Sequence, residues 1–243
     1  MGTSIMVTSG KGGTGKTSLT AGVASCLAAL GHRVLCVDMD IGLRNLDIAL
    51  GMTDRAVMDF TDVMERRCSL LTGACEQPDI RGLHLLTAPV HAEGLDVKRF
   101  RQVIEDAKES YDFVFLDSPA GLGEGFQLAK AAADRAILVS STEPAALRDA
   151  QRAVSELVSE VDQLHLVMNR VEPKLMRHLH TTIDEAMDTA GLPLLGVVPE
   201  DDHVLIAAAK GVPIVLCTNQ GASRAYLNVA RRLLGRRVAL MKR

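Results

Sequence analysis

A glycine-rich turn with two lysines, Gly10-Lys-Gly-Gly-Thr-Gly-Lys-Thr17, follows an apolar segment near the start of the chain. Glycine lets such a turn take positive φ and approach an anion closely, and the N–H groups that open the next helix point at that anion. The second lysine, Lys16, is placed to reach the outer phosphates of a nucleotide, and the Thr17 hydroxyl is placed to bind Mg²⁺. The turn therefore predicts a nucleotide-phosphate site. Its expected contacts are Lys11, Gly12, Gly13, Thr14, Gly15, Lys16, Thr17 and Ser18.

Lys11 is a second cation, which the geometry of an ordinary phosphate loop does not require. A single lysine in a loop is most often simply solvated. The other charged residues of the chain therefore decide what Lys11 does.

Carboxylates close two apolar segments that have the length of strands. Asp38 and Asp40 end one of them, and Asp117 ends Phe113-Val-Phe-Leu-Asp117. Side chains two residues apart on an extended chain point to the same side, so we expect Asp38 and Asp40 to face a magnesium-phosphate group together. One of the two could stand in the outer shell of the metal while the other orients the attacking water. In phosphate-loop hydrolases an acidic residue placed like Asp117 holds Mg²⁺ directly or through water.

Three further polar groups follow strand-like segments. The N–H of Gly121 is placed to sense the terminal phosphate, and the neighbouring glycines allow this segment to rearrange on hydrolysis. Asn169 and Arg170 follow another segment, and Pro199 opens an acidic group after the last one. An Asn amide can pair with the donor and acceptor edge of adenine. These positions predict recognition of the base, with an ordinary turn as the alternative.

Apolar segments of strand length alternate with helical patterns along most of the chain, which is typical of parallel strands joined by crossover helices. The expected strands are 5–9, 34–38, 83–87, 113–117, 136–140, 164–169 and 194–199. The expected helices are 16–30, 97–109, 125–133, 145–161, 175–190 and 223–234. The sequence thus predicts an α/β fold with a mostly parallel central sheet covered by helices on both faces. Ligands bind at the carboxyl ends of the strands in such sheets, so the polar groups above should converge at one edge.

Length and composition favour one cytoplasmic domain. The 243 residues contain no linker-like stretch, no Trp and few aromatic residues. The five cysteines are scattered and read as reduced thiols, and no spacing suggests a metal or cluster site. Neither a leader nor an apolar run of membrane-spanning length is present in the sequence. A net charge of −3 argues against general nucleic-acid binding, although basic residues crowd the last twenty positions.

Several segments together carry a resemblance to a known family. These are Thr8-Ser-Gly-Lys-Gly-Gly-Thr-Gly-Lys-Thr17, Asp38-Met-Asp-Ile-Gly-Leu-Arg-Asn-Leu-Asp47, Asp117-Ser-Pro-Ala-Gly121, Arg148-Asp149 and Gly196-Val-Val-Pro-Glu-Asp201. The chain resembles the septum site-determining ATPases of the MinD family, within the ParA/MinD group of deviant Walker A proteins. The phosphate loop marks only the wider group, and the segment 40–47 narrows the resemblance to MinD. The match extends to about Leu234.

The resemblance implies a Mg²⁺-dependent ATPase that forms a homodimer on binding ATP. Lys11 would cross the interface to the partner's phosphates and would be catalytic together with Lys16 and Asp40, which positions the water. Thr17, Asp38 and Asp117 would sit at the metal and Asn169 near adenine. The helix with Arg148 and Asp149 would meet a division inhibitor resembling MinC and an activator resembling MinE. The ATP dimer would bind the inner face of the cell membrane reversibly, and hydrolysis would release it.

The C-terminal end departs from the family pattern. Relatives usually continue into an amphipathic membrane helix, whereas in this chain the domain of residues 1–234 is followed by a short basic tail, 235–243. Apolar residues recur at helical spacing among basic ones: Tyr226, Ala230, Leu233, Leu234, Val238 and Met241. This stripe is either a basic amphipathic helix or, as we favour for residues 226–234, the last helix packing on the sheet. In the second case only the tail is free to act as a membrane anchor.

Other functions remain open at the level of sequence. Within the same group they are a flagellar-number regulator and a chromosome or plasmid partition ATPase that would bind DNA through its basic residues. A redox iron protein of this fold would need paired cysteines across a dimer, which the sequence does not offer. The last alternative is a scaffold that binds ATP without hydrolysing it.

Overall fold

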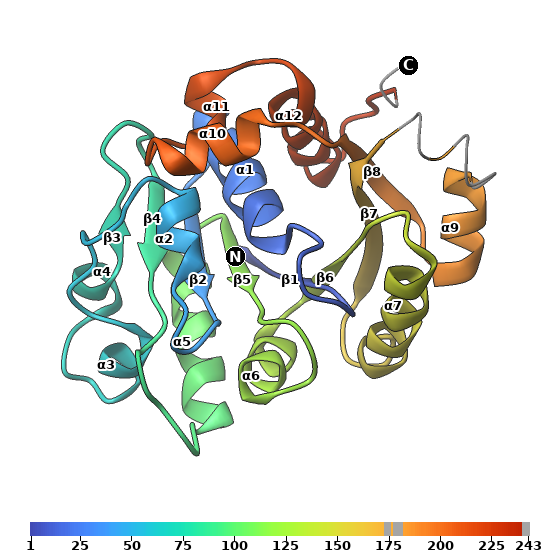
Figure 1. Ribbon diagram of the computed structural model, residues 1–243. Coiled ribbons are helices and arrows are strands. Elements are labelled where there is room, and N and C mark those ends of the chain that lie inside the picture. The colour runs from blue at the N-terminus through green and yellow to red at the C-terminus, as the bar shows by residue number, and fades with distance from the viewer. Residues whose placement is uncertain (173–175, 177–181, 240–243) are drawn as a thin grey trace.

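A mostly parallel sheet forms the centre of the protein in the computed structural model, which describes residues 1–172, 176 and 182–239. Within that part the strand order is β3-β4-β2-β5-β1-β6-β7-β8 (Figure 1). The strands are β1 (Thr3–Thr8), β2 (Val34–Asp38), β3 (Cys75–Glu76), β4 (Leu83–Leu86), β5 (Phe113–Asp117), β6 (Arg135–Ser140), β7 (Gln163–Val171) and β8 (Leu194–Pro199). All neighbours pair in parallel except β3 and β4, which are antiparallel.

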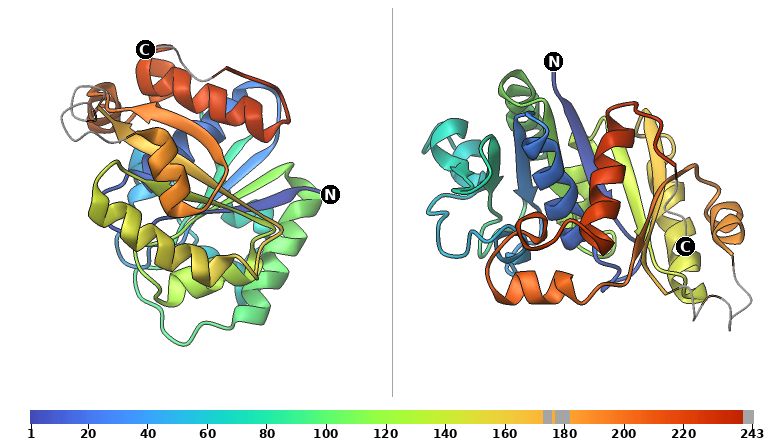
Figure 2. Two further views of the ribbon diagram at one scale, coloured as in Figure 1. Left: turned by 90° about the vertical axis from the view of Figure 1, so that its right-hand side faces the viewer. Right: turned by 90° about the horizontal axis from the view of Figure 1, so that it is seen from above.

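Helices cover both faces of the sheet. They are α1 (Lys16–Ala29), α2 (Asn45–Ala49), α3 (Phe60–Met64), α4 (Leu70–Gly73), α5 (Val97–Ser110), α6 (Glu124–Ala132), α7 (Pro144–Leu157), α9 (Ile183–Ala190), α10 (His203–Ala209), α11 (Ile214–Cys217) and α12 (Gly221–Leu233). In Figure 2 the red α12 and the green α5 lie on opposite sides of the strands. Each face therefore has its own apolar core.

Successive side chains along a strand point to opposite faces of the sheet and so pack into the two cores in turn. In β1, Ile5 and Val7 belong to the cluster under α1 and α12, while Met6 between them belongs to the cluster under α5 and α6. All three side chains are fully buried. A strand that is covered on both faces is mostly apolar along its length, which explains the apolar runs in the sequence. Ser4 of β1 is buried as well, and its hydroxyl donates to the Ala132 carbonyl at 2.8 Å.

The sheet brings the functional residues to one edge because its strands run in the same direction. Asp38 ends β2 and is the register partner of Asp117, which ends β5. Asp117 also lies beside Val7 of β1, immediately before the phosphate loop. The convergence expected from topology is thus confirmed.

All seven expected strands are confirmed, with shifts of one or two residues at their ends. The two-residue β3 and the short helices α2, α3, α4, α10 and α11 were not predicted from sequence. The predicted helix 175–190 appears only as α9, which begins at Ile183, and residues 173–175 and 177–181 lie outside the described part.

The last helix packs on the sheet, as we favoured. Tyr226 and Ala230 are buried in the core shared with α1. The helix ends at Leu233, and Gly235 follows with a φ of 73°, so the apolar stripe does not continue as one helix to Val238. Residues 240–243, and Met241 with them, are outside the described part.

The start of the tail is not free, which corrects our expectation. The Arg232 guanidinium donates to the carbonyls of Leu195, Val238 and Ala239 at 2.9–3.3 Å. Arg232 therefore fastens the described end of the chain to β8. Among the helices of the described residues, none has the length and apolar character needed to cross a membrane.

Candidate nucleotide-binding site

A cavity of about 390 Å³ opens at the carboxyl edge of the sheet. Most of the residues predicted from sequence line it: Gly12, Gly13, Gly15, Lys16, Thr17, Ser18, Asp40, Asp117, Asn169, Arg170 and Pro199. Four predicted residues do not line it, namely Lys11, Thr14, Asp38 and Gly121. The cavity also has walls that were not predicted from sequence to contact a ligand, including Asn45, Ala120, Leu205 and Tyr226.

The phosphate loop is shaped for an anion. Gly13 and Gly15 have φ values of 78° and 85°, and a Cβ on Gly15 would lie 2.3 Å from the Asn169 amide nitrogen. Helix α1 begins directly after Gly15, and no side chain caps its first N–H groups. Those N–H groups and the positive end of the helix dipole are available to a phosphate.

Lys16 is a buried cation within this loop. Its side chain is 8% exposed, and its ammonium donates to the Ser9 hydroxyl at 3.0 Å. Burial lowers the pKa of Lys16, and the nearby carboxylates Asp117 and Asp40 partly oppose that shift. Because burial penalises its charge, Lys16 gains from the arrival of an anionic ligand.

Asp117 forms the floor of the site and is 2% exposed. It accepts a hydrogen bond from the Thr20 hydroxyl at 2.9 Å and a further one from the Thr17 side chain. Burial raises the pKa of Asp117 to about 6, while the bonds from Thr17 and Thr20 and the charge of Lys16 pull it down.

The donors around Asp117 fit Mg²⁺. Hydroxyl and carboxylate oxygens are its preferred ligands, and it keeps several waters and binds phosphate oxygens as well. Thr17, Asp117 and Asp40 supply oxygens in one cavity. The described residues hold no group of three or more His, Cys, Asp and Glu that would form a metal site without a ligand. The site thus suits a metal that arrives with a nucleotide.

Asp38 does not face the cavity together with Asp40, which corrects our expectation. Strand β2 ends at Asp38, so the extended geometry that would align the two side chains stops there. One Asp38 carboxylate oxygen accepts the N–H of Asp40 at 2.9 Å and the other accepts the N–H of Leu46 at 3.1 Å. Burial, and next the charge of Asp117, raise the pKa of Asp38 to about 7.

The opposite wall of the cavity is tied to the phosphate loop. The Asn169 amide donates to the carbonyls of Thr14 and Gly15 at 2.8 and 3.3 Å. Arg170 has a φ of 57°, makes two hydrogen bonds to the Glu200 carboxylate and a third to the Gly13 carbonyl at 3.0 Å. Within the described part of the chain the Asn169 carbonyl oxygen accepts no hydrogen bond, and Arg170 and Glu200 brace the wall.

Lys11 lies outside the cavity and is about half exposed. Its ammonium pairs with the Glu143 carboxylate at 2.9 Å, just before α7, and this hydrogen bond is the main reason that the pKa of Glu143 is lowered. This ion pair forms within one chain and was not predicted from sequence. Glu143 belongs to the Thr-Glu-Pro segment that precedes and opens α7.

The neighbourhood of Lys11 also contacts α7. A Cβ on Gly10 would lie 2.1 Å from the backbone of Asp149, so only glycine fits between the loop and the helix. Arg148 is exposed on that helix. Thr14 is buried behind the loop, and Gly121 has a φ of 86° with open space on its side-chain face.

The fold and this cavity define a phosphate-loop nucleotide-binding protein. The family model described as "CobQ/CobB/MinD/ParA nucleotide binding domain" matches residues 5–214. The chain belongs to this family, and within it to the MinD group of nucleotide-binding ATPases.

Relatives of known name cover almost the whole chain. The septum site-determining protein MinD of Bacillus subtilis is 39% identical over an alignment of 246 positions, which covers 99% of this chain and 92% of the relative. The MinC:MinD cell division protein complex of Aquifex aeolicus has a chain that is 35% identical with a TM-score of 0.92, covering 99% of this chain and 98% of that one. MinD of Pyrococcus horikoshii, complexed with Mg-ADP, is 27% identical with a TM-score of 0.82, covering 96% of each chain.

Proposed function

We propose that this protein is an ATP-dependent, dimerising switch that sets the position of the division septum by recruiting a division inhibitor. The support is its membership of the MinD group together with a cavity that suits a magnesium-bound nucleotide. The Aquifex relative is named in a complex with MinC, and the partner proposed for this chain is an inhibitor of that kind.

The nucleotide phosphates would lie on the loop, against Lys16 and the first N–H groups of α1. When bound, Mg²⁺ would be held by Thr17 and Asp117 and would neutralise charge on the phosphates. Asp40, a partly exposed carboxylate of the cavity, would orient the attacking water. The free carbonyl oxygen of Asn169 would accept the exocyclic amino group of adenine, which guanine lacks at that position.

The proposed dimer rests on the position of Lys11. Lys16 already serves the phosphate loop from within, whereas Lys11 stands outside the cavity with its ammonium in a surface ion pair. Surface pairs of this kind are worth only about 0–1 kcal/mol, so Lys11 can leave Glu143 at little cost. Lys11 is therefore available to the phosphates of a second copy, where it would act as an arginine finger does in other hydrolases.

Helix α7 is the proposed surface for the inhibitor and for an activator resembling MinE. Arg148 lines a cleft of about 450 Å³ between α7 and α9, with Leu147, Gln151 and Glu185 among the other walls. The helix touches the phosphate loop through Gly10 and Asp149. Its position would thus respond to the nucleotide, and hydrolysis would weaken the partner's hold. Reversible attachment to the inner face of the membrane is part of this proposal.

The test of the dimer is Lys11→Ala. We expect the variant to bind a fluorescent ATP analogue within about threefold of the wild type, because Lys16 and the N–H groups of α1 remain. In sedimentation velocity with ATP and Mg²⁺, the wild type should form a dimer and the variant should stay monomeric. A variant that dimerises as well as the wild type contradicts the role of Lys11.

The recruiting function has a separate test. Purified division inhibitor from the same genome should bind the wild type with ATP and should not bind it with ADP. Arg148→Glu should lose this binding while keeping ATP-dependent dimerisation. Equal binding in ATP and ADP would contradict the switch.

A further inference from the structure

A single buried carboxylate closes the loop that carries Asp40. The Asp38 side chain is 1% exposed, and its two oxygens accept the N–H groups of Asp40 and Leu46 at 2.9 and 3.1 Å. These two residues stand at the two ends of the segment 40–46. Asp38 thus fixes both ends of this segment to the end of strand β2.

The segment itself has little regular structure that could hold it. Within it the N–H groups of Leu43 and Arg44 point at the Asp40 carbonyl at 3.2 and 3.5 Å, and Arg44 has a φ of 46°, a conformation that costs energy for a residue other than glycine. Leu43 at the tip is 67% exposed. A strained and exposed turn needs other contacts to hold it in place. The two hydrogen bonds to the buried Asp38 side chain are such contacts.

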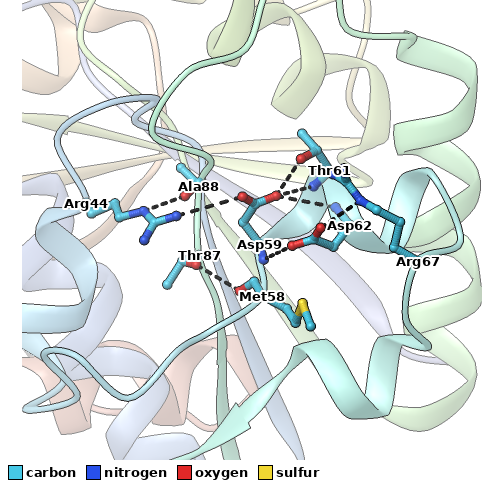
Figure 3. A network of polar contacts seen from close by, with 8 residues as sticks. All are labelled: Arg44, Met58, Asp59, Thr61, Asp62, Arg67, Thr87 and Ala88. Carbon is cyan, nitrogen blue, oxygen red and sulfur yellow. Dashed lines mark hydrogen bonds and ion pairs between the residues drawn. The ribbon is translucent and has the colours of Figure 1, made fainter.

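A second set of contacts holds the segment from outside (Figure 3). The Arg44 guanidinium donates to the Ala88 carbonyl at 2.7 Å and lies 3.8 Å from the Asp59 carboxylate, which caps α3. The backbone N–H of Gly42 donates to the Pro89 carbonyl at 3.2 Å. These contacts reach the middle of the segment, whereas those of Asp38 reach its ends, next to Asp40.

The chemistry of the position calls for an aspartate. Two N–H groups need acceptors at two places, and the two oxygens of a carboxyl group provide them. An asparagine has the same shape but only one acceptor oxygen. Its side-chain NH₂ group would face the second backbone N–H, and two donors cannot form a hydrogen bond with each other. Both oxygens face these N–H groups and Asp38 does not line the cavity, which leaves it poorly placed to act as a ligand of the metal.

We propose that Asp38 is a positioning residue that holds the segment 40–46 closed and thereby sets the reach of the Asp40 carboxylate into the cavity. The proposal rests on the proposed role of Asp40 in hydrolysis. It assigns to Asp38 an action through the backbone, in place of the metal contact that the sequence suggested.

Limited trypsin digestion tests the closed segment without any measurement of activity. The bond after Arg44 lies inside the segment, and we expect it to be cut roughly tenfold or more faster in Asp38→Ala, because two hydrogen bonds to a buried charge are lost. Asp38→Asn, which keeps one acceptor, should fall between. Asp47→Asn is the matched control, because within the described part of the chain its carboxylate accepts only the neighbouring N–H of Ile48. Mass spectrometry of the fragment that ends at Arg44 identifies the cut.

Kinetics then separate positioning from metal binding. We expect Asp38→Asn to lower kcat by roughly tenfold while the affinity for an ATP analogue and the Mg²⁺ concentration for half-maximal rate stay within about twofold of the wild type. Cleavage after Arg44 at the wild-type rate in both Asp38 variants, or a shift of the Mg²⁺ requirement by roughly tenfold, overturns the proposal.

A further variant separates this proposal from the one on which it rests. Asp40→Ala should lower kcat by roughly 100-fold with normal nucleotide affinity. Full activity of Asp40→Ala would contradict the proposed catalytic role of Asp40. The digestion does not depend on activity, so it would still show whether Asp38 holds the segment 40–46 closed. Thermal melting of each variant, with a transition as cooperative as that of the wild type, shows that the rest of the fold is retained.

Discussion

Asp38 and Asp117 lie opposite each other at the ends of β2 and β5, and both carboxyl groups are almost fully buried. Burial is the main cause that raises their pKa values, to about 7 for Asp38 and to about 6 for Asp117. The fold therefore holds these acidic groups in an environment that disfavours their charge. A cation bound with the nucleotide relieves this penalty.

The buried pair predicts how the stability of the ligand-free protein depends on pH. Both pKa values are higher in the folded state than the usual 3.8, so the folded state binds these protons more tightly than the unfolded one. The resulting stabilisation is complete below about pH 4 and is lost as the pH rises through 6 and 7. For Asp117 alone, the rise from 3.8 to about 6 corresponds to on the order of 3 kcal/mol.

We therefore expect Asp117→Asn to lose less stability than the wild type between pH 5 and 8. Urea unfolding at several pH values, without nucleotide or Mg²⁺, measures the difference. Asp79→Asn, which changes an exposed carboxylate far from the cavity, serves as the control and should follow the wild type. A parallel pH profile for Asp117→Asn and the wild type would contradict the raised pKa of Asp117.

At the level of single residues, the sequence indicated which side chains gather at the cavity but not how each is directed. The positions of Lys16 and Thr17 follow from the turn, because glycine spacing and the start of a helix determine them. The direction of Asp38 depends on where β2 stops and on the N–H of Leu46, eight residues away. The contact between Lys11 and Glu143 joins residues 132 positions apart, and no local pattern announces it.

Helices α1 and α12 meet at a glycine. Tyr226 of α12 is 1% exposed and lies against Gly22 of α1, where a Cβ would stand 2.2 Å from the aromatic ring. The helix that opens with the phosphate loop is thus seated directly on the last helix of the domain. Its position depends on the absence of a side chain at one place.

Gly22→Val should push these helices apart. Overpacking of this kind costs about 1–3 kcal/mol, which urea denaturation would detect. Since α1 presents the phosphate loop, the affinity for an ATP analogue should fall as well. Ala29→Val, at the exposed end of the same helix, is the control and should cost only about 0.5 kcal/mol through helix propensity. Equal stability of the two variants would contradict the close contact at Gly22.

The long elements were predictable and the short ones were not, for physical reasons. A strand buried on both faces leaves a short apolar run rich in aromatic and β-branched residues, as in Phe113-Val-Phe-Leu116, and its length and composition favour a strand over a helix. Helices of four to seven residues, such as α4 and α10, are too short for a periodic pattern. Some of them depend on caps and on contacts with distant segments, as α3 does on the Asp59 cap that Arg44 approaches (Figure 3).

At the scale of the whole molecule, the basic C-terminal end is the candidate for membrane contact. Arg236 and Arg237 are exposed beside the point where Arg232 fastens the tail to β8. Each basic residue near an anionic membrane contributes about 1 kcal/mol to the free energy of binding. A dimer would present two tails, and so twice as many basic residues, to the membrane. The tail is therefore expected to bind weakly as a monomer and more strongly in the ATP dimer.

Co-sedimentation with anionic liposomes measures this expectation. With ATP and Mg²⁺ the full chain should pellet with the vesicles, and a chain ending at Leu234 should do so roughly tenfold less, because the basic residues of the tail are lost. Binding should also fall with added salt and be weak with ADP. Zwitterionic vesicles serve as the control. If both chains bind anionic vesicles equally, the tail is not the anchor.

The place of β1 in the sheet has a consequence for how the protein is made. This strand precedes the other strands in the chain, yet its two neighbours are β5 and β6, more than a hundred residues later. The cavity is completed later still, by Asn169, Pro199 and Tyr226. Contacts so distant in sequence form slowly and only after their partners exist. The walls of this cavity can therefore come together only after Tyr226 has been synthesised.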